Sequence, residues 1–204
     1  MKVLRFFVPG LCAVGVAACA YATARLVGWV PAGKLALYPA WAGSHFATAS
    51  AFAILAPFQL WPGLRARRPA LHRLMGRITA AIGAGMAVSG IAIVYTAPDR
   101  QVSERIFMTV FFAAYLAFLA LGVRAAVARS IPAHQAWMVR MVATALTPVT
   151  QRLLFPPLAA TLGVHGMETF WELFVSAAWI GWGLNMLTAE AWLHGRPARR
   201  LATA

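Results

Sequence analysis

The sequence predicts an all-α, polytopic integral membrane protein with six transmembrane helices and both chain ends in the cytoplasm. Three observations support this prediction: the apolar composition, the apolar segments long enough to span a bilayer, and basic residues gathered between alternate segments. Of the 204 residues, 61% are apolar and only 11% are charged, whereas soluble domains have about 45–50% and about 25%. A water-soluble domain could not bury so much apolar surface. The composition therefore excludes a soluble enzyme, a disordered chain and a nucleic-acid-binding domain.

A transmembrane helix needs about 20 mostly apolar residues, and six stretches of the sequence meet this requirement. Together they use most of the chain, so every connection is short and no soluble domain fits. We expect residues 1–204 to form one helical bundle. The predicted spans are residues 6–29, 38–61, 74–97, 106–123, 135–155 and 169–193.

The first segment has a competing interpretation, because residues 2–24 have the basic start, apolar stretch and small-residue end of a cleaved signal peptide. Residues 16–19 also resemble a weak bacterial lipoprotein motif ending at Cys19. The segment is long enough to span and further spans follow, so we expect it to be retained as the first helix. Cys12 and Cys19 would lie about 10 Å apart along it, which is too far for a disulfide bond.

The second and third segments are joined by a short connection, so we expect an antiparallel pair of helices. Each has a stripe of small residues at every fourth position, which allows membrane helices to approach closely. The two stripes are Gly43, Ala47 and Ala51 on the second segment, and Ala81, Gly85 and Ser89 on the third.

The charges orient the bundle. The formal net charge is +13, which in a soluble chain would suggest a polyanion such as nucleic acid. Here the positive-inside rule explains the charge better, and membrane lipids rather than nucleic acid are the expected partners. Twelve of the 18 basic residues fall on the predicted cytoplasmic side: Lys2, Arg5, Arg65, Arg67, Arg68, Arg73, Arg77, Arg124, Arg129, Arg196, Arg199 and Arg200. Four of the five acidic residues fall on the other side: Asp99, Glu104, Glu168 and Glu172.

The fifth segment carries a polar stripe, and ionisable groups inside a bilayer are costly enough to be functional candidates. Pro148 is expected to bend this helix. If segments five and six are antiparallel neighbours, Arg140 meets Glu190 and Arg152 meets Glu172. These are either ion bridges that hold two helices together or the polar lining of a cavity for an anionic group or a proton path. The stripe consists of Arg140, Thr144, Thr147 and Gln151.

Two histidines begin predicted spans on the cytoplasmic side: His72 starts the third and His134 starts the fifth. A pair of histidines on different helices can ligate a b-type haem from both faces, and Arg73, Arg77 and Arg140 would bind its propionates. The third segment has a glycine-bearing face that leaves room for a flat macrocycle or for another helix. That face consists of His72, Gly76, Thr79, Gly83, Met86 and Gly90.

His45 lies near the other end of the second segment, roughly 25 Å of helix from the cytoplasmic side, so it cannot share a metal with His72 and His134. It could form a second site with His165. The alternatives to haem are histidines bonded to lipid or backbone, and histidines that transfer protons. We find no zinc-protease, phosphate-loop or nucleophile-elbow motif in the sequence, so catalysis by protein side chains alone is not expected.

Three blocks of the sequence, within residues 45–77, 134–153 and 179–190, resemble the bacterial membrane family catalogued as domain of unknown function 2306. The resemblance implies a helical integral membrane protein of the bacterial plasma membrane and supplies no activity. Gln135 departs from the pattern, where a basic residue is expected after the histidine. Histidines at several helix ends also give a fold-level likeness to cytochrome b561. The family pattern marks His45, Gln59, His72, Arg73, Gly76, Arg77, His134, Trp137, Arg140, Arg152, Asn185 and Glu190.

The sequence supports three hypotheses for function. The first is a redox protein with haem b bound by His72 and His134. The second is a small transporter or proton-coupled carrier that uses the stripe containing Arg140. The third is a structural or assembly subunit of a larger membrane complex, or of a homo-oligomer.

Overall fold

The computed structural model describes residues 39–97 and 100–195, together with residues 10, 13, 15–17, 20, 21, 23 and 24. The described residues of the predicted first span are helical. Most of that span, with Cys12 and Cys19, and the basic tail after residue 195 lie outside the described residues. The structure is entirely helical over the residues it describes, with no strand among them.

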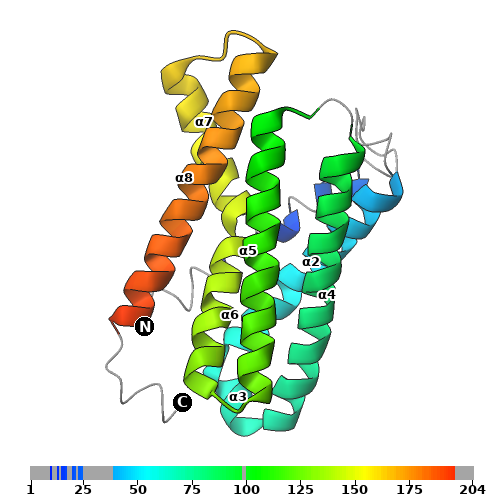
Figure 1. Cartoon of the computed structure of the whole chain (residues 1–204), viewed down its shortest axis with the longest axis vertical. Helices are drawn as coiled ribbons and strands as arrows, with labels where there is room; N and C mark the ends of the chain where they lie inside the picture. Colours follow the sequence, from blue (N-terminus) through cyan, green and yellow to red (C-terminus); the bar gives the residue numbers. More distant parts are fainter. Residues whose placement is uncertain are drawn as a thin grey trace. The chain divides into compact units, whose positions relative to one another are not determined.

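The helices follow one another with short connections (Figure 1). The chain divides into two compact units, Met1–Pro98 and Asp99–Ala204, which we call unit 1 and unit 2. The predicted single bundle of all spans stays a prediction. In chain order the helices are α2 (Pro39–Leu60), α3 (Pro62–Arg67), α4 (Pro69–Thr96), α5 (Val102–Val127), α6 (Ile131–Ala145), α7 (Thr147–Leu162) and α8 (Met167–His194).

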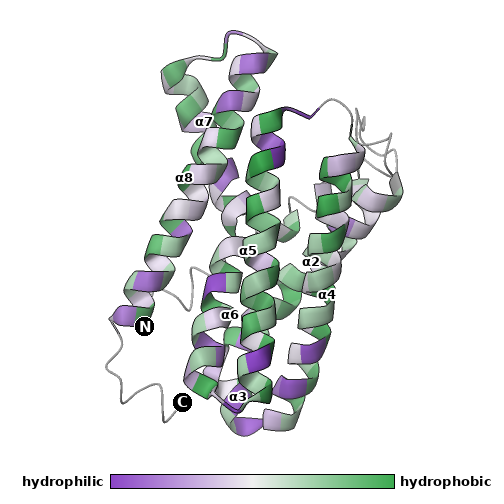
Figure 2. Ribbon diagram, in the orientation of Figure 1, coloured by the Kyte–Doolittle hydropathy of each residue, from purple (hydrophilic) through white to green (hydrophobic). Residues whose placement is uncertain are grey.

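Four predicted spans, residues 38–61, 74–97, 106–123 and 169–193, coincide with α2, α4, α5 and α8 to within a few residues. Among the described helices, α4 and α5 are long and apolar enough to cross a membrane. Hydrophobic residues recur along both ribbons (Figure 2), and the apolar side chains of Ile78, Val88, Ile106 and Val110 are all exposed. Such outward apolar surface suits contact with lipid rather than water. The other predicted spans stay predictions.

In unit 1, α2 runs antiparallel to α4, as predicted, and α3 connects them in place of a loop. Two contacts fix the antiparallel order. Thr48 in the middle of α2 lies against Gly85 just past the middle of α4, and Gln59 at the end of α2 lies against Gly76 early in α4. Prolines begin both α3 and α4, a position where the missing N–H costs no hydrogen bond.

The small-residue stripe predicted for α2 was wrong. A Cβ at Gly43 would contact no described residue within 4 Å, and Ala47 is exposed. The buried side of α2 instead carries Ala42, Phe52 and Ala56. Adjacent helix positions differ by about 100° around the axis, so small residues on neighbouring faces cannot be ranked by spacing alone. On α4, Ala81 is exposed as well, whereas Ser89 is buried and Gly85 faces Thr48.

In unit 2, α5 and α6 form an antiparallel hairpin, and α8 runs back along both α6 and α7 (Figure 1). The predicted single bent helix over residues 135–155 is corrected: the structure ends α6 at Ala145 and begins α7 at Thr147. Pro148 cannot donate to the carbonyl of Thr144, and it disfavours helical geometry at the residue before it. Both effects act at the junction between α6 and α7.

Candidate functional site

Arg140 and Glu190 form an ion pair between α6 and α8, as predicted. The guanidinium Nε donates to Glu190 Oε1 at 2.5 Å and Nη2 donates to Oε2 at 2.8 Å. This two-point geometry is the strongest form of the arginine–carboxylate interaction. The side chains retain 22% and 33% of their exposure, so the pair is half-buried and one side remains accessible.

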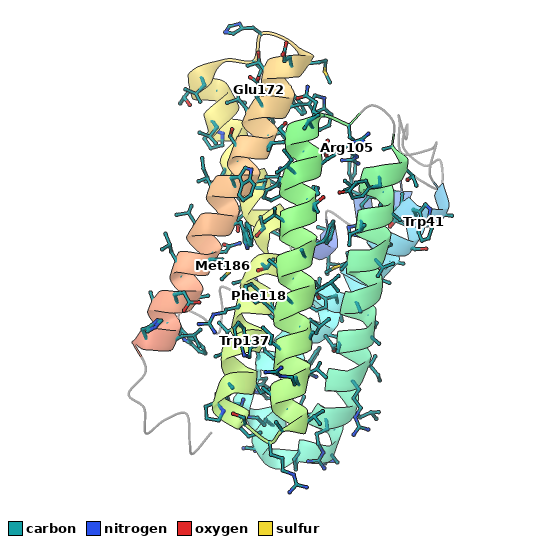
Figure 3. The ribbon with its side chains drawn as sticks, in the orientation of Figure 1. Trp41, Arg105, Phe118, Trp137, Glu172 and Met186 are labelled. Atoms are coloured by element: carbon teal, nitrogen blue, oxygen red, sulfur yellow. The ribbon has the colours of Figure 1, made fainter. Side chains whose placement is uncertain are left out.

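Further contacts fix the orientation of this pair. The guanidinium lies 4.9 Å from the centre of the Trp137 ring, a cation–π distance. Trp137 in turn stacks on Phe118 of α5 at 5.8 Å (Figure 3). On the other side, Nδ1 of His194 donates to the carbonyl of Glu190 at 2.8 Å and lies 3.7 Å from Oε2 of the carboxylate. Three helices therefore position one arginine.

A stripe of buried polar side chains runs from this pair along α6 and α7, as the spacing predicts. Thr144, Thr147 and Gln151 are 0%, 1% and 4% exposed. The Thr144 hydroxyl donates to the carbonyl of Arg140 at 3.0 Å and accepts from Nε1 of Trp182 at 3.2 Å. Met186 lies on the same side of α8 (Figure 3), with its sulfur 3.8 Å from the Thr144 hydroxyl.

The stripe ends with Gln151, whose side-chain nitrogen donates to the carbonyl of Phe174 on α8 at 2.9 Å. Between Thr144 and Gln151, the hydroxyl of Thr147 is buried and has no hydrogen-bond partner among the described residues. A buried hydroxyl without a partner costs about 1–3 kcal/mol. A group of this kind calls for an explanation beyond packing.

Three further residues of the site were not assigned a place in it by sequence reasoning. Thr150 donates to Oδ1 of Asn185 at 3.0 Å, and the amide nitrogen of Asn185 is buried with no acceptor in the described part of the chain. Gly181 allows α7 to approach α8, because a Cβ there would lie 3.3 Å from the backbone nitrogen of Gln151. The family pattern marked Asn185, whereas Thr150 and Gly181 lie within the family-like blocks but were given no role.

Aromatic side chains pack on both sides of the junction between α6 and α7. Phe107 of α5 meets Trp179 of α8 edge-on at 5.0 Å, and Trp179 lies 5.8 Å from Trp182. Toward the other end of α8, Phe155 meets Phe170 at 5.0 Å. These rings place bulky apolar groups beside Thr144, in the middle of the polar stripe, and beyond its Gln151 end.

The second predicted pair, Arg152 with Glu172, stays a prediction. Nη1 of Arg152 donates to the carbonyl of Pro148 at 2.7 Å. Glu172 is exposed near the start of α8 (Figure 3). An ion pair that sequence reasoning missed joins Arg100 to Glu104 at the start of α5, where Glu104 is buried. Its four-residue spacing was the available signal.

His134 at the start of α6 is held by a backbone contact within unit 2. Its Nδ1 lies 2.9 Å from the carbonyl oxygen of Gly122 on α5. The bond requires a proton on Nδ1, so in the neutral ring Nε2 is the nitrogen with a free lone pair. Gly122 also allows close approach, because a Cβ there would lie 1.9 Å from the terminal methyl of Met138.

In unit 1, Nδ1 of His45 lies 2.9 Å from the carbonyl oxygen of Met86, which joins α2 to α4. His72 is in the first turn of α4, followed by the exposed residues Arg73 and Arg77. His72 and His134 belong to different units, as do His45 and His165, so both predicted histidine pairs stay predictions. Among the described residues, no group of three or more histidine, cysteine, aspartate or glutamate side chains could hold a metal ion.

Residues 43–193 match the profile of a family described as "Predicted membrane protein (DUF2306)". The chain belongs to this family. No curated protein and no solved structure matches the sequence. The match confirms the resemblance expected from the three sequence blocks, and it includes both residues of the Arg140–Glu190 pair and all of α4 and α5. The DUF2306 protein is therefore a membrane protein, while the likeness to cytochrome b561 stays a prediction.

Proposed function

We propose that this DUF2306 protein is a small proton-coupled carrier of the bacterial plasma membrane, with six spans and both ends in the cytoplasm. The observation that supports it is the interruption between α6 and α7 beside a buried polar stripe that includes the unpartnered hydroxyl of Thr147. In membrane proteins, broken helices are tolerated where they are buried in protein or line a water-filled path. In secondary transporters they form the binding site for substrate and coupling ion.

The groups of the stripe have the chemistry that proton movement requires. Hydroxyl and amide groups both donate and accept hydrogen bonds, so Thr144, Thr147 and Gln151 could order water molecules along the interface with α8. Glu190 is the carboxylate at one end of the stripe, and it can accept a proton when its contact with Arg140 opens. The arginine would then be available to an anionic substrate.

The test measures proton uptake into liposomes that contain the full-length protein and a trapped pH-sensitive dye, driven by a potassium diffusion potential. Thr147→Val removes the unpartnered hydroxyl and keeps the side-chain volume. We expect it to lower the initial rate of uptake severalfold. The matched control is Thr161→Val, which removes an exposed hydroxyl that bonds only within α7, and it should leave the rate unchanged.

Equal rates for Thr147→Val and the wild type would contradict the proposed role of the stripe. A second measurement follows recovery of internal pH in cells after an acid load. Cells that produce Arg140→Ala should recover more slowly than cells that produce the wild type. Identical recovery at equal protein levels would count against a carrier that uses this pair.

A second candidate function, haem binding, is supported by the contact of His134 with Gly122. Histidines that bind metal nearly always donate their second ring nitrogen to a carbonyl, carboxylate or water, and His134 has this arrangement. We propose His72 as the second ligand, with Arg73, Arg77 and Arg140 as propionate partners. The test is the absorption spectrum of protein purified from cells supplied with haem. A Soret band that His134→Leu abolishes is expected, and its absence from the wild type would contradict haem binding.

A further inference from the structure

Five arginines occur within thirteen residues where α2 ends, α3 forms and α4 begins. Four of them are exposed and the first is half-buried. We call this group the basic end of unit 1. It consists of Arg65, Arg67, Arg68, Arg73 and Arg77.

No carboxylate within unit 1 can partner these arginines, because residues 1–98 contain no aspartate or glutamate. Two of the five acidic residues in the chain, Glu104 and Glu190, are already paired with Arg100 and Arg140. The other three, Asp99, Glu168 and Glu172, fall on the opposite side of the membrane in the predicted topology. With that topology, no unpaired aspartate or glutamate of the chain lies on the side of the basic end, so we look for its negative partner outside the chain.

Two buried hydrogen-bond donors at the same end also lack acceptors among the described residues: Nε2 of Gln59 and Nε of Arg65. The side-chain oxygen of Gln59 lies against α4, 3.2 Å from where a Cβ of Gly76 would be. Both unpartnered atoms are N–H donors, so the missing partner is an oxygen acceptor. An anionic oxygen would satisfy these donors and the arginines together.

Apolar side chains next to the arginines distinguish a lipid from a soluble anion. Trp61 precedes α3 and is 55% exposed, and tryptophans of this kind gather at membrane–water interfaces. On α4, Leu71, Leu74 and Ile78 are all exposed, and their spacing places them on one side of the helix. Acyl chains could lie along that side while the phosphate contacts the guanidinium groups.

We infer that the basic end of unit 1 is a binding site for the phosphate headgroup of an anionic phospholipid. Arginine binds phosphate through two parallel N–H donors, and basic clusters beside membrane helices recognise anionic headgroups. The inference depends on the membrane location of the family and is independent of the proposed carrier function. The proton-uptake assay tests the carrier function and the lipid-binding assay tests this site. Either proposal can therefore fail while the other holds.

The test is native mass spectrometry of the full-length protein, purified in detergent, stripped of lipid and titrated with cardiolipin or with phosphatidylcholine. We expect one cardiolipin to remain bound under conditions that remove phosphatidylcholine. Arg67→Gln with Arg68→Gln should weaken cardiolipin binding by about tenfold or more, because each arginine near an anionic surface contributes about fivefold. The matched control is Arg124→Gln with Arg129→Gln, which removes one exposed arginine from the last turn of α5 and one from the connection between α5 and α6.

Three results would overturn the inference: equal losses in the two double variants, equal retention of phosphatidylcholine and cardiolipin, or displacement of cardiolipin by millimolar inorganic phosphate. The first would indicate general attraction to a positive chain, the second an apolar contact only, and the third a site for a soluble anion. If the first double variant does not fold, Arg73→Gln with Arg77→Gln makes the same test on the exposed side of α4.

Discussion

The two units differ in how their charged residues are partnered. Unit 2 contains all five acidic residues, and two of them form ion pairs with arginines in the same unit. Unit 1 has no acidic residue, and a polar contact between its helices α2 and α4 is a histidine on a backbone carbonyl. The stability of unit 2 should therefore depend on individual charges. In unit 1 the arginines should affect what binds to the protein far more than how stable it is.

The difference also explains where a helix can be interrupted. In unit 2 the side chains of Thr150 and Gln151 bond to α8, so polar contacts between α7 and α8 begin within one turn of the junction. In unit 1, α4 runs unbroken for 28 residues. A broken helix in an apolar environment needs polar neighbours to bond its freed backbone groups, and in unit 2 the hydroxyl of Thr150 lies 3.3 Å from the carbonyl oxygen of Leu146 at the junction.

The largest expected effect on stability comes from substitutions in the Arg140–Glu190 pair. Arg140→Met leaves the Glu190 carboxylate without a partner, and Glu190→Gln leaves the Arg140 guanidinium without a charged partner. Removing one member of a fully buried pair costs about 3–5 kcal/mol. This pair is 22% and 33% exposed, so each single change should lower the free energy of unfolding by about 2 kcal/mol. Chemical unfolding in detergent micelles, followed by tryptophan fluorescence, measures this loss.

The double variant should lose less than the sum of the two single variants, because the second change removes a charge that the first left unpartnered. Two controls sharpen the comparison. Glu172→Gln in unit 2 and Arg73→Gln in unit 1 both alter exposed residues, and each should change stability by less than about 0.5 kcal/mol. A large loss from Arg73→Gln would mean that unit 1 has a charge partner that we have not identified.

The next largest effect on stability is expected from a change in the packing of α7 against α8. Gly181→Ala places a Cβ 3.3 Å from the backbone nitrogen of Gln151, so α7 and α8 must separate slightly. We expect a loss of about 1–2 kcal/mol, within the usual range for overpacking. Gly43→Ala is the matched change in unit 1, where a Cβ lies within 4 Å of no atom in the described part of the chain. It should leave stability unchanged or raise it slightly, since alanine favours helix. Equal effects at both glycines would contradict the contact assigned to Gly181.

Much of the fold could be predicted because apolar length and turn residues are local signals. The apolar segments that form α4 and α5 are uninterrupted, whereas α3, which begins at Pro62, was expected only as a short connection. The stripe on α2 could not be predicted, because Gly43 and Ala47 are as small as the residues that face α4, and only the neighbouring helix decides which side is buried. Likewise, Pro148 predicted a bend, but whether a helix bends or divides depends on the contacts around it.

At the candidate site, the helical spacing of Arg140, Thr144 and Gln151 was enough to predict a shared face, and opposite charge was enough to predict Glu190 as a partner. Thr150 and Asn185 could not be paired from sequence, because a hydroxyl and an amide have many equivalent partners. The backbone carbonyls of Gly122 and Met86 also could not be predicted as histidine partners. Every residue has a carbonyl, and the sequence does not indicate which one a histidine will bind.

A smaller effect is expected at His45 in unit 1. His45→Leu removes the hydrogen bond to the Met86 carbonyl and keeps an apolar side chain between α2 and α4. The net value of such a bond is about 1 kcal/mol, and we expect a loss of that size in thermal or chemical unfolding. The comparison is His165→Leu in the exposed connection between α7 and α8, which should have no measurable effect. If His45→Leu leaves the free energy of unfolding unchanged, apolar packing alone holds this helix pair together.

The smallest expected change in stability is an increase, and it is expected from Thr147→Val, the same variant that tests the proposed function. Thr147→Val replaces a buried hydroxyl that has no partner among the described residues with a methyl group of nearly equal volume. The polar group no longer has to be buried without a bond, so the free energy of unfolding should rise, by up to about 1 kcal/mol. If the same variant also lowers proton uptake, the loss cannot result from misfolding. A variant that is less stable than the wild type would instead show that Thr147 has a structural partner, such as a bound water, and that its hydroxyl is needed to hold α7 against α8.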